Sequence, residues 1–196
     1  MRQVAAMREG RGDRTRTALV HAALELFDRK GAEQTSIDEI THAANVAKGT
    51  FYVHFQRKED VLLELAAQVI ESLDHHALPE GAADALHALG DRLAVLMADM
   101  PREVTGRMVR EIIGHREDWI RVLGNRHKVG DCIQPIVEAA QASGQMRTDQ
   151  TPARLAQGLV ILWLDSIIGW AERPVERPLE RDLAKATSLF LNGARG

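Results

Sequence analysis

The segment from Ser36 to Lys58 constrains this chain more than any other, because its residues predict two short helices joined by a tight corner. Ser36 and Glu39 form a capping box, in which each side chain bonds to the backbone N–H of the other residue, and this fixes the start of the first helix. Asn45 enters the left-handed backbone region at low cost, so the chain can turn sharply before the second helix begins. Helix pairs of this kind are the layout with which many proteins enter the major groove of DNA.

The second of these helices has an apolar face and a polar face. Phe51 and Phe55 are four residues apart and share the face that packs inward, whereas Lys48 and Tyr52 share another face. A lysine supplies charge to DNA phosphates, and hydroxyl and imidazole groups supply hydrogen bonds. The groups that we expect to be offered outward are Lys48, Thr50, Tyr52 and His54, with Gly49 allowing close backbone approach. The alternative is an ordinary amphipathic helix pair with lysine and tyrosine on its solvent side.

The pattern extends well beyond this pair of helices. It is carried by Leu24-Glu25-Leu26-Phe27, Gly31, Thr35-Ser36-Ile37, Ile40, the run Ala43 to Tyr52, His54-Phe55 and Lys58-Glu59-Asp60-Val61-Leu62. Over about residues 14 to 62 the sequence resembles the amino-terminal domain of the TetR family of bacterial transcriptional repressors. The resemblance implies an all-α fold, with an N-terminal three-helix helix-turn-helix DNA-binding domain and a larger C-terminal helical ligand-binding and dimerisation domain.

The resemblance also implies, residue by residue, which side chains meet DNA. They are Ser36 at the start of the first helix, Lys48, Thr50, Tyr52 and His54 on the second helix, and Lys58 beyond it. Lys48 and Thr50 come earliest on the second helix, where base edges are usually reached, and the later residues resemble phosphate contacts. The division between base and backbone contacts stays open at this point.

Composition is compatible with this reading. The chain has 196 residues, 45% of them hydrophobic, and its one cysteine, Cys132, excludes an internal disulfide framework and a cysteine-based zinc site. We find no apolar run of about 18 residues and no signal-peptide core, so we expect a soluble, cytoplasmic protein without a membrane span.

The N-terminus is basic although the whole chain carries a net charge of −3. Its arginines, opposed only by Glu9 and Asp13, are Arg2, Arg8, Arg11, Arg14 and Arg16. We interpret residues 1–13 as a basic arm that lies along phosphates or enters a minor groove. A solvated tail is the alternative, and both descriptions can hold for the bound and free states.

Helical periodicity continues through the rest of the chain. We expect a DNA-binding domain over residues 14–57 and a helical ligand-binding and dimerisation domain over residues 58–196. Outside the central pair, the expected helices run over residues 14–30, 58–76, 82–100, 102–114, 119–143, 151–171 and 179–194. The 58–76 helix is long enough to leave the first domain and act as a lever.

Methionine and other apolar residues gather in the middle of the second domain, where the TetR resemblance implies that a small molecule is held. Methionine suits irregular cavities because its side chain is adaptable. The candidate pocket residues are Leu96, Met97, Met100, Met108, Ile112, Trp119 and Leu123. For any single one of them, ordinary core packing is the alternative.

The last two helices are strongly apolar, and Gly158 and Gly169 permit close backbone approach. We expect them to form a four-helix bundle across the two-fold axis of a homodimer. The candidate interface residues are Leu155, Leu159, Leu162, Trp163, Ile167, Trp170, Leu183, Thr187 and Phe190. Packing within one chain is the alternative.

These features predict a ligand-responsive transcriptional regulator that binds a palindromic double-stranded DNA operator as a homodimer. A DNA-binding regulator without an inducer and a helical scaffold for another protein are the alternatives. We expect no enzyme activity, since the sequence has no Gly-rich phosphate loop, HExxH or GxSxG motif. We also expect no cofactor and no metal, because the histidines lack zinc-helix spacing.

Overall fold

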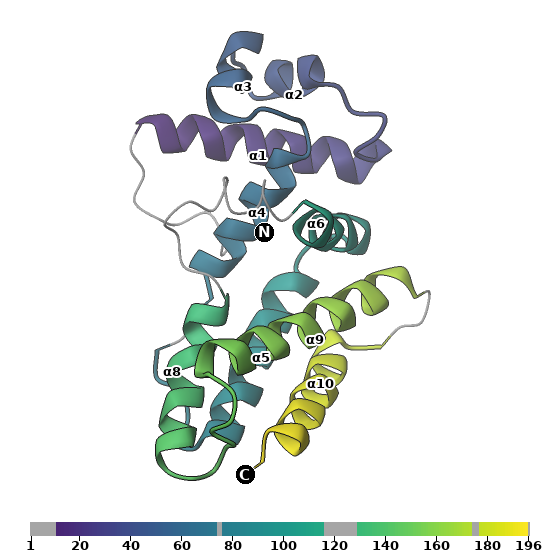
Figure 1. Cartoon of the computed structure of the whole chain (residues 1–196). Helices are drawn as coiled ribbons and strands as arrows, with labels where there is room; N and C mark the ends of the chain where they lie inside the picture. The colour runs from purple at the N-terminus through teal and green to yellow at the C-terminus, as the bar shows by residue number, and fades with distance from the viewer. Residues whose placement is uncertain (1–10, 74–75, 116–128, 174–176, 196) are drawn as a thin grey trace. The chain divides into compact units, whose positions relative to one another are not determined.

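The structure is a computed structural model that describes residues 11–73, 76–115, 129–173 and 177–195. Within those ranges the regular secondary structure is α-helical, as predicted (Figure 1). The helices are α1 (Arg11–Lys30), α2 (Ile37–Ala43), α3 (Lys48–His54), α4 (Asp60–Glu71), α5 (Ala82–Ala98), α6 (Arg102–Gly114), α8 (Val129–Ala142), α9 (Pro152–Glu172) and α10 (Leu179–Ala194). Residues 1–10 of the predicted basic arm lie outside the described residues.

The chain divides into two compact units. The first contains residues 1–68 together with 107–124, and the second contains residues 69–106 together with 125–196. Helices α4 and α6 each have residues in both units. The first unit therefore takes in more than residues 14–57, because most of α4 and the second half of α6 belong to it.

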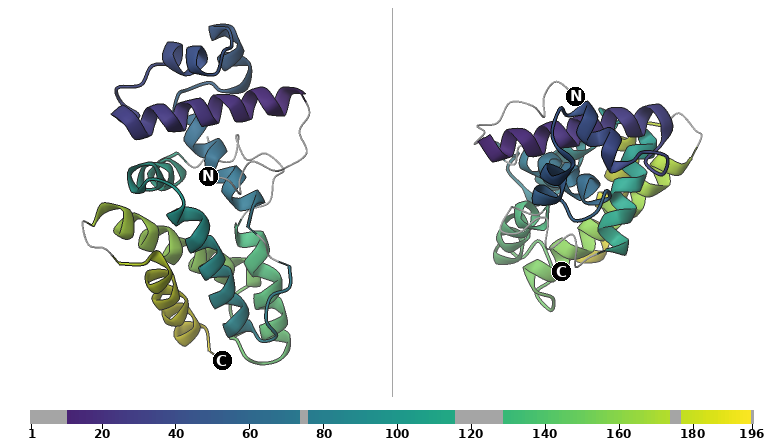
Figure 2. Two further views of the ribbon diagram at one scale, coloured as in Figure 1. Left: turned by 180° about the vertical axis from the view of Figure 1, so that it is seen from behind. Right: turned by 90° about the horizontal axis from the view of Figure 1, so that it is seen from above.

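Local signals set the ends of the helices in the first unit. Gly31, with φ of 80°, ends α1, and Asn45, with φ of 54°, makes the corner between α2 and α3. The predicted capping box is confirmed: the N–H of Glu39 donates to Ser36 Oγ at 3.3 Å, and the N–H of Ser36 donates to the Glu39 carboxylate at 2.9 Å. Helices α2 and α3 lie on one side of α1, and α4 begins on its other side (Figures 1 and 2).

Helix α4 is shorter than the helix that we predicted over residues 58–76. It begins at Asp60, whose buried carboxylate accepts hydrogen bonds from the N–H groups of Gln56 and Arg57 at 2.9 and 3.2 Å. It ends at Glu71, and the N–H of Leu73 bonds to the Ile70 carbonyl three residues back. The apolar stripe on which the prediction was based continues to the buried Leu73, beyond the last helical residue. An apolar stripe can therefore extend further than the helical hydrogen bonds do.

In the second unit, α5, α8, α9 and α10 pack together, with α5 and α9 each lying against α8 and α10. The buried indole of Trp163 on α9 donates a hydrogen bond to Thr187 Oγ1 on α10 at 3.0 Å. Gly90 on α5 faces the same ring, because a Cβ at this position would lie 3.3 Å from it. One indole thus ties three helices together.

The other predicted helices of this unit are found close to their expected bounds. Helix α10 has the predicted bounds, and Thr151 caps α9 by accepting a hydrogen bond from the N–H of Arg154 at 3.3 Å. Pro135 lies inside α8. The helix predicted over residues 119–143 is described only from Val129, since residues 116–128 lie outside the described part of the chain.

Among the described helices, α9 is long and apolar enough by length and composition to cross a membrane, a run that the sequence analysis had not found. It packs against α8 and α10. Only 28% of its apolar window is buried inside the single chain. The exposed residues of α9 are Ala153, Arg154, Gln157, Ile161, Asp165 and Glu172, and the apolar Leu155, Leu162 and Leu164 are partly exposed.

Candidate nucleic-acid interface

Helix α3 is fixed in orientation by its two phenylalanines. Phe51 and Phe55 are 0% and 1% exposed, with ring centres 5.4 Å apart, and the guanidinium of Arg16 on α1 lies over the Phe55 ring. The rest of the helix surface faces outward: Tyr52 is 53% and Val53 79% exposed. Lys48 and Gly49 are exposed, and Thr50 and His54 are partly exposed. The structure therefore brings the predicted recognition-helix residues together on one accessible surface.

An acidic residue that the sequence analysis missed shares this surface. Asp38 on α2 forms an ion pair with Lys48, with Oδ1 and Nζ 2.8 Å apart and both side chains more than half exposed. The hydrogen bond from Lys48 to Asp38 raises the pKa of Lys48. Because the carboxylate repels phosphate and holds the same ammonium that would bind it, Asp38 competes with DNA for Lys48.

Lys58 also has its charge engaged within the protein. Its Nζ donates to the carbonyl oxygens of Thr35 at 2.9 Å and Glu33 at 3.4 Å, which ties the start of α2 to the turn before α4. An ammonium has three donor hydrogens, so the predicted contact with DNA would use the remaining one.

The capping box at Ser36 carries a further ion pair. Lys30 hydrogen-bonds to Glu39, and this bond, with those from Ser36, lowers the pKa of Glu39 to about 2. Because the pKa in the folded state lies below the ordinary value of 4.5, this stabilisation is complete above that pH and is lost as the pH falls toward 2. The start of α2 is therefore charged and capped at neutral pH.

Ion pairs between distant segments complete the first unit. Arg16 on α1 pairs with Glu64 on α4 at 2.6 Å, and Glu64 is only 2% exposed. Arg107 on α6 pairs with Glu33 at 3.0 Å. No sequence pattern could have predicted these contacts, because their partners lie far apart along the chain. The Arg16–Glu64 pair joins α1 to α4, and the Arg107–Glu33 pair joins α6 to the loop between α1 and α2.

The predicted small-molecule residues are only partly described. Met97 and Met108 are buried, whereas Leu96, Met100 and Ile112 are partly exposed. The α5 residues of this set belong to the second unit and the α6 residues Met108 and Ile112 to the first. Trp119 and Leu123 lie outside the described residues. The pocket stays a prediction.

Most of the residues that we predicted for the dimer interface are buried inside the single chain. Their exposed fractions are 0% to 7%, so they cannot lie at a surface between copies. These residues are Leu159, Trp163, Ile167, Trp170, Leu183 and Thr187. Trp163 and Thr187 join α9 to α10 through their hydrogen bond, and the others belong to the core of the second unit. Helical spacing did not show this, because a helix with apolar residues on both sides gives no sign of which side packs internally.

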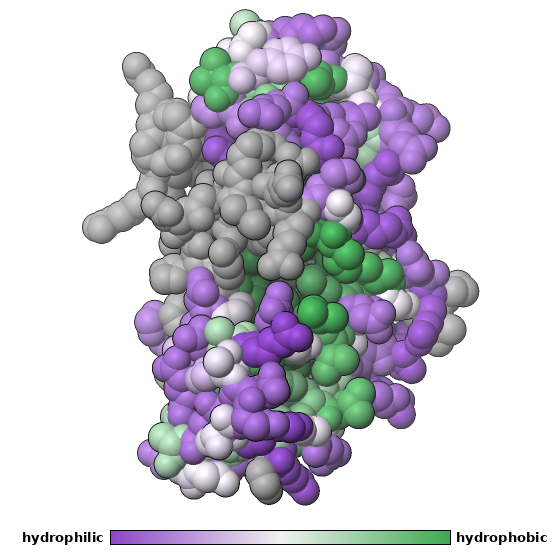
Figure 3. Space-filling view, viewed as in Figure 1, coloured by the Kyte–Doolittle hydropathy of each residue, from purple (hydrophilic) through white to green (hydrophobic). Residues whose placement is uncertain are grey.

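The remaining three residues of that set face a shallow hollow between α9 and α10. The hollow has a volume of about 250 Å³, and it is lined by the apolar Leu155, Leu162, Leu189, Phe190 and Ala194, the glycines Gly158 and Gly193, and the charged Arg147 and Arg154. Figure 3 shows hydrophobic side chains gathered over these two helices. Ile161 and Leu189, which the sequence analysis missed, are 58% and 65% exposed.

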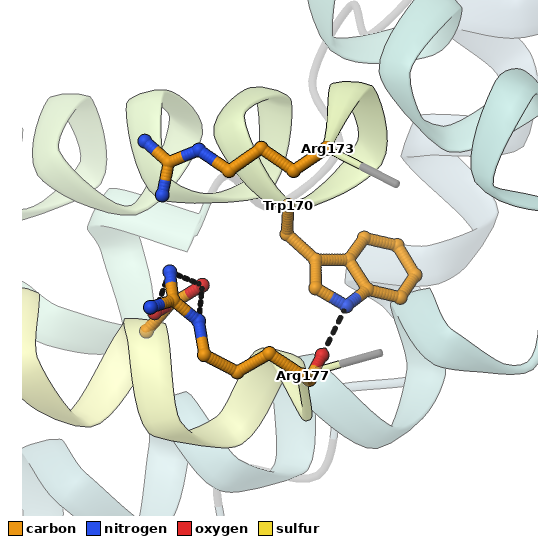
Figure 4. A pocket seen from close by; sticks show the side chains of 4 residues that line it. Trp170, Arg173 and Arg177 are labelled. Carbon is orange, nitrogen blue, oxygen red and sulfur yellow. Dashed lines mark hydrogen bonds and ion pairs between the residues drawn. The ribbon is translucent and has the colours of Figure 1, made fainter. Parts of the chain in front are cut away.

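A smaller hollow lies where α9 ends and α10 begins (Figure 4). Trp170 donates from its indole N–H to the Arg177 carbonyl at 2.9 Å, Arg177 pairs with Asp182, and Arg173 lies across the hollow from that pair. Its volume of about 150 Å³ is below the roughly 300 Å³ at which ligand pockets begin. In the described part of the chain, no group of three or more potential metal ligands is found.

Both units match a known family. Residues 19–65 match the bacterial regulatory proteins of the tetR family, and residues 59–193 match the C-terminal domain of TetR/AcrR family transcriptional repressors. Together with the exposed polar face of α3, these matches define a helix-turn-helix transcriptional regulator. The chain belongs to the TetR family, whose members are DNA-binding regulators and not enzymes.

Relatives align along nearly the whole chain. The probable transcriptional regulator ArpR of Pseudomonas putida is 27% identical over 194 residues, covering 92% of this chain and 91% of the relative. The regulator TtgR of P. putida is 25% identical and covers 85% of this chain and 90% of its own length. Among solved structures, the TetR-family repressor FadR of Thermus thermophilus, in complex with lauroyl-CoA, superimposes with a TM-score of 0.75 at 27% identity, covering 91% of this chain and 94% of that one.

The ion pair between Asp38 and Lys48 predicts that Asp38→Asn strengthens DNA binding. Removing the carboxylate frees the ammonium and removes a repulsion, so we expect affinity for a DNA duplex to rise about three- to fivefold at low salt and the gain to shrink at high salt. Fluorescence anisotropy with a labelled duplex measures the affinity at low salt and at high salt. Asp84→Asn makes the same charge change at an exposed position of α5 and should leave affinity unchanged. Equal affinities for Asp38→Asn and the wild type would contradict the competition.

Proposed function

We propose that this protein is a cytoplasmic transcriptional repressor that binds a palindromic DNA operator as a homodimer and is released by a small, largely hydrophobic molecule. The observation that carries the DNA-binding part is the orientation of α3. Burial of Phe51 and Phe55 leaves Lys48, Thr50 and Tyr52 on an exposed face. A cation and hydroxyl groups on such a face can contact phosphates and base edges of one major groove.

Binding to a palindrome needs a second copy, and the outer side of α9 and α10 supports one. A single recognition helix contacts only a few base pairs, whereas two related by a dyad contact half-sites about 34–36 Å apart or a multiple of that. Leu189, 65% exposed, lines the hollow between α9 and α10, and Ile161 on α9 is 58% exposed. Only 28% of the apolar window of α9 is fully buried in the single chain. We place the dimer interface on this outer side, with the partly exposed Leu155 and Leu162 and the exposed Ile161 and Leu189 in it. Phe190 is 8% exposed and belongs to the core beneath.

The effector proposal rests on the middle of the second unit and on one relative. The T. thermophilus repressor binds lauroyl-CoA, which has a long apolar chain. In the second unit, Leu96 and Met97 on α5 and Met100 just beyond its end supply apolar and adaptable side chains. Met108 and Ile112 lie on the part of α6 that belongs to the first unit. Helix α4 follows α3 in the chain and has residues in both units, so we propose that the effector acts through α4. A coupling of about 1–3 kcal/mol is typical of such an effect.

Selection of bound duplexes from a random DNA library tests the repressor proposal, and Lys48→Ala tests its site. We expect the wild type to enrich a palindrome and Lys48→Ala to bind it at least about tenfold more weakly, with a smaller dependence of affinity on salt because fewer counterions are released. Arg181→Ala, which removes an exposed cation from α10, is the matched control. Affinity that survives Lys48→Ala would refute the site, and failure to enrich any sequence would refute the function.

Ile161→Glu should separate the two copies. A carboxylate on the outer side of α9 would be buried without a partner in the dimer, so we expect the dimer to dissociate about a hundredfold more readily or more. Analytical ultracentrifugation measures the mass, and circular dichroism should show that the helices persist. Val95→Glu places the same charge at a similarly exposed position of α5, 56% exposed against 58%, and should remain dimeric. Unchanged mass for Ile161→Glu would place the interface elsewhere.

Lauroyl-CoA is the first probe for the effector. We expect it to raise the melting temperature of the protein and to release the selected operator, whereas free coenzyme A, which lacks the apolar chain, should do neither. Release by both compounds would show that the apolar chain is not what is recognised. If acyl chains and other apolar compounds all leave operator affinity unchanged, the alternative of a regulator without an inducer is favoured.

A further inference from the structure

The most outward residue of α3 is apolar. Phe51 and Phe55 define the buried side of the helix, and at about 100° per residue Val53 lies about 180° around the helix axis from the line between them. Val53 is 79% exposed, the largest exposed fraction among the exposed large hydrophobic residues of the described chain. Gly49, one turn earlier, shares this side and has open space where a Cβ would stand. The centre of the exposed face therefore carries no polar side-chain group.

A single exposed valine is ordinary on a protein surface, but its position on α3 makes it informative. Around the helix, Thr50 lies about 60° from Val53 on one side, and Tyr52 and His54 lie about 100° from it on either side. The exposed face therefore has a polar border around an apolar centre formed by Gly49 and Val53. The first residues of a recognition helix usually reach the base edges, and Val53 is one turn beyond Gly49 on the same side of α3. If α3 enters a major groove with this side inward, Val53 also faces the bases. Val53 must then lie against whatever the bases present there.

The major groove presents hydrogen-bond donors and acceptors and only one apolar group, the C5-methyl of thymine. A valine pressed against the amino group of cytosine or the oxygen of guanine would remove it from water without supplying a hydrogen-bond partner. Against a thymine methyl it loses nothing and buries two apolar surfaces. We infer that Val53 contacts the 5-methyl group of one thymine in each half-site of the operator. This inference rests on the proposed function, since it requires α3 to lie in a major groove.

Replacing thymine by deoxyuridine in the selected operator removes the methyl group and leaves the base pairing unchanged. We expect one symmetric pair of thymines at which this replacement weakens wild-type binding roughly three- to fivefold per half-site, the loss expected for one buried methyl group. Val53→Ala should bind the thymine operator more weakly than the wild type does. Replacing thymine by deoxyuridine should then lower the affinity of Val53→Ala by almost nothing further. Because Val53 is exposed, this substitution leaves the core intact, which circular dichroism can verify.

Two control variants sharpen the test. Val53→Thr keeps the shape of the side chain but replaces one methyl by a hydroxyl, so we expect an intermediate sensitivity to the thymine methyl. Val95→Ala removes an exposed valine from α5 in the second unit and should show the full wild-type penalty for deoxyuridine.

The outcomes separate this inference from the proposed function. If an operator is enriched but deoxyuridine costs the same in the wild type and in Val53→Ala at every position, Val53 does not contact a thymine methyl and the repressor proposal still stands. If no duplex is enriched, α3 does not enter a groove and both proposals fail.

Discussion

The rest of this structure depends on the burial of two phenylalanines. Helix α3 has seven residues, and isolated helices shorter than about 12–15 residues are only marginally stable in water, so α3 persists because Phe51 and Phe55 pack into the first unit. The same burial fixes the rotation of the helix about its axis. That rotation decides which side chains face outward, and hence which groups a groove of DNA would meet. Stability and recognition are therefore set by the same two side chains.

The exposed surface around α2 and α3 carries cations that are already paired within the protein, so it is not a simple basic patch. Lys48 is paired with Asp38, Lys30 with Glu39, and Lys58 is bonded to backbone carbonyls, so these cations already have partners before DNA arrives. The affinity for DNA then reflects how much stronger the bonds to phosphates are than the bonds within the protein that they replace. Such a surface binds phosphates less strongly than the number of its cations suggests, which leaves more of the discrimination to the base edges.

In the second unit, α9 and α10 have an inner side that packs in the core and an outer side that carries exposed apolar residues. On the inner side, the Trp163 indole meets Thr187 and Gly90, so α5, α9 and α10 are joined around a fully satisfied polar group. On the outer side, Ile161 and Leu189 remain exposed, which is unfavourable in water unless a second surface covers them. Helices α4 and α6 each have residues in both units.

The sequence by itself determined the features that depend on residues a few positions apart. The capping box of Ser36 and Glu39, the corner at Asn45, the cap at Thr151 and the two faces of α3 follow from local hydrogen bonds and helical spacing. The tertiary structure decided what needs a distant partner. It showed that Trp163 and Thr187 bond within one chain, that Lys58 reaches the carbonyl of Thr35, and that Arg107 pairs with Glu33. Helical spacing identifies the residues that share a side, but only packing identifies which side is covered, because burial is a property of the surroundings and not of the helix.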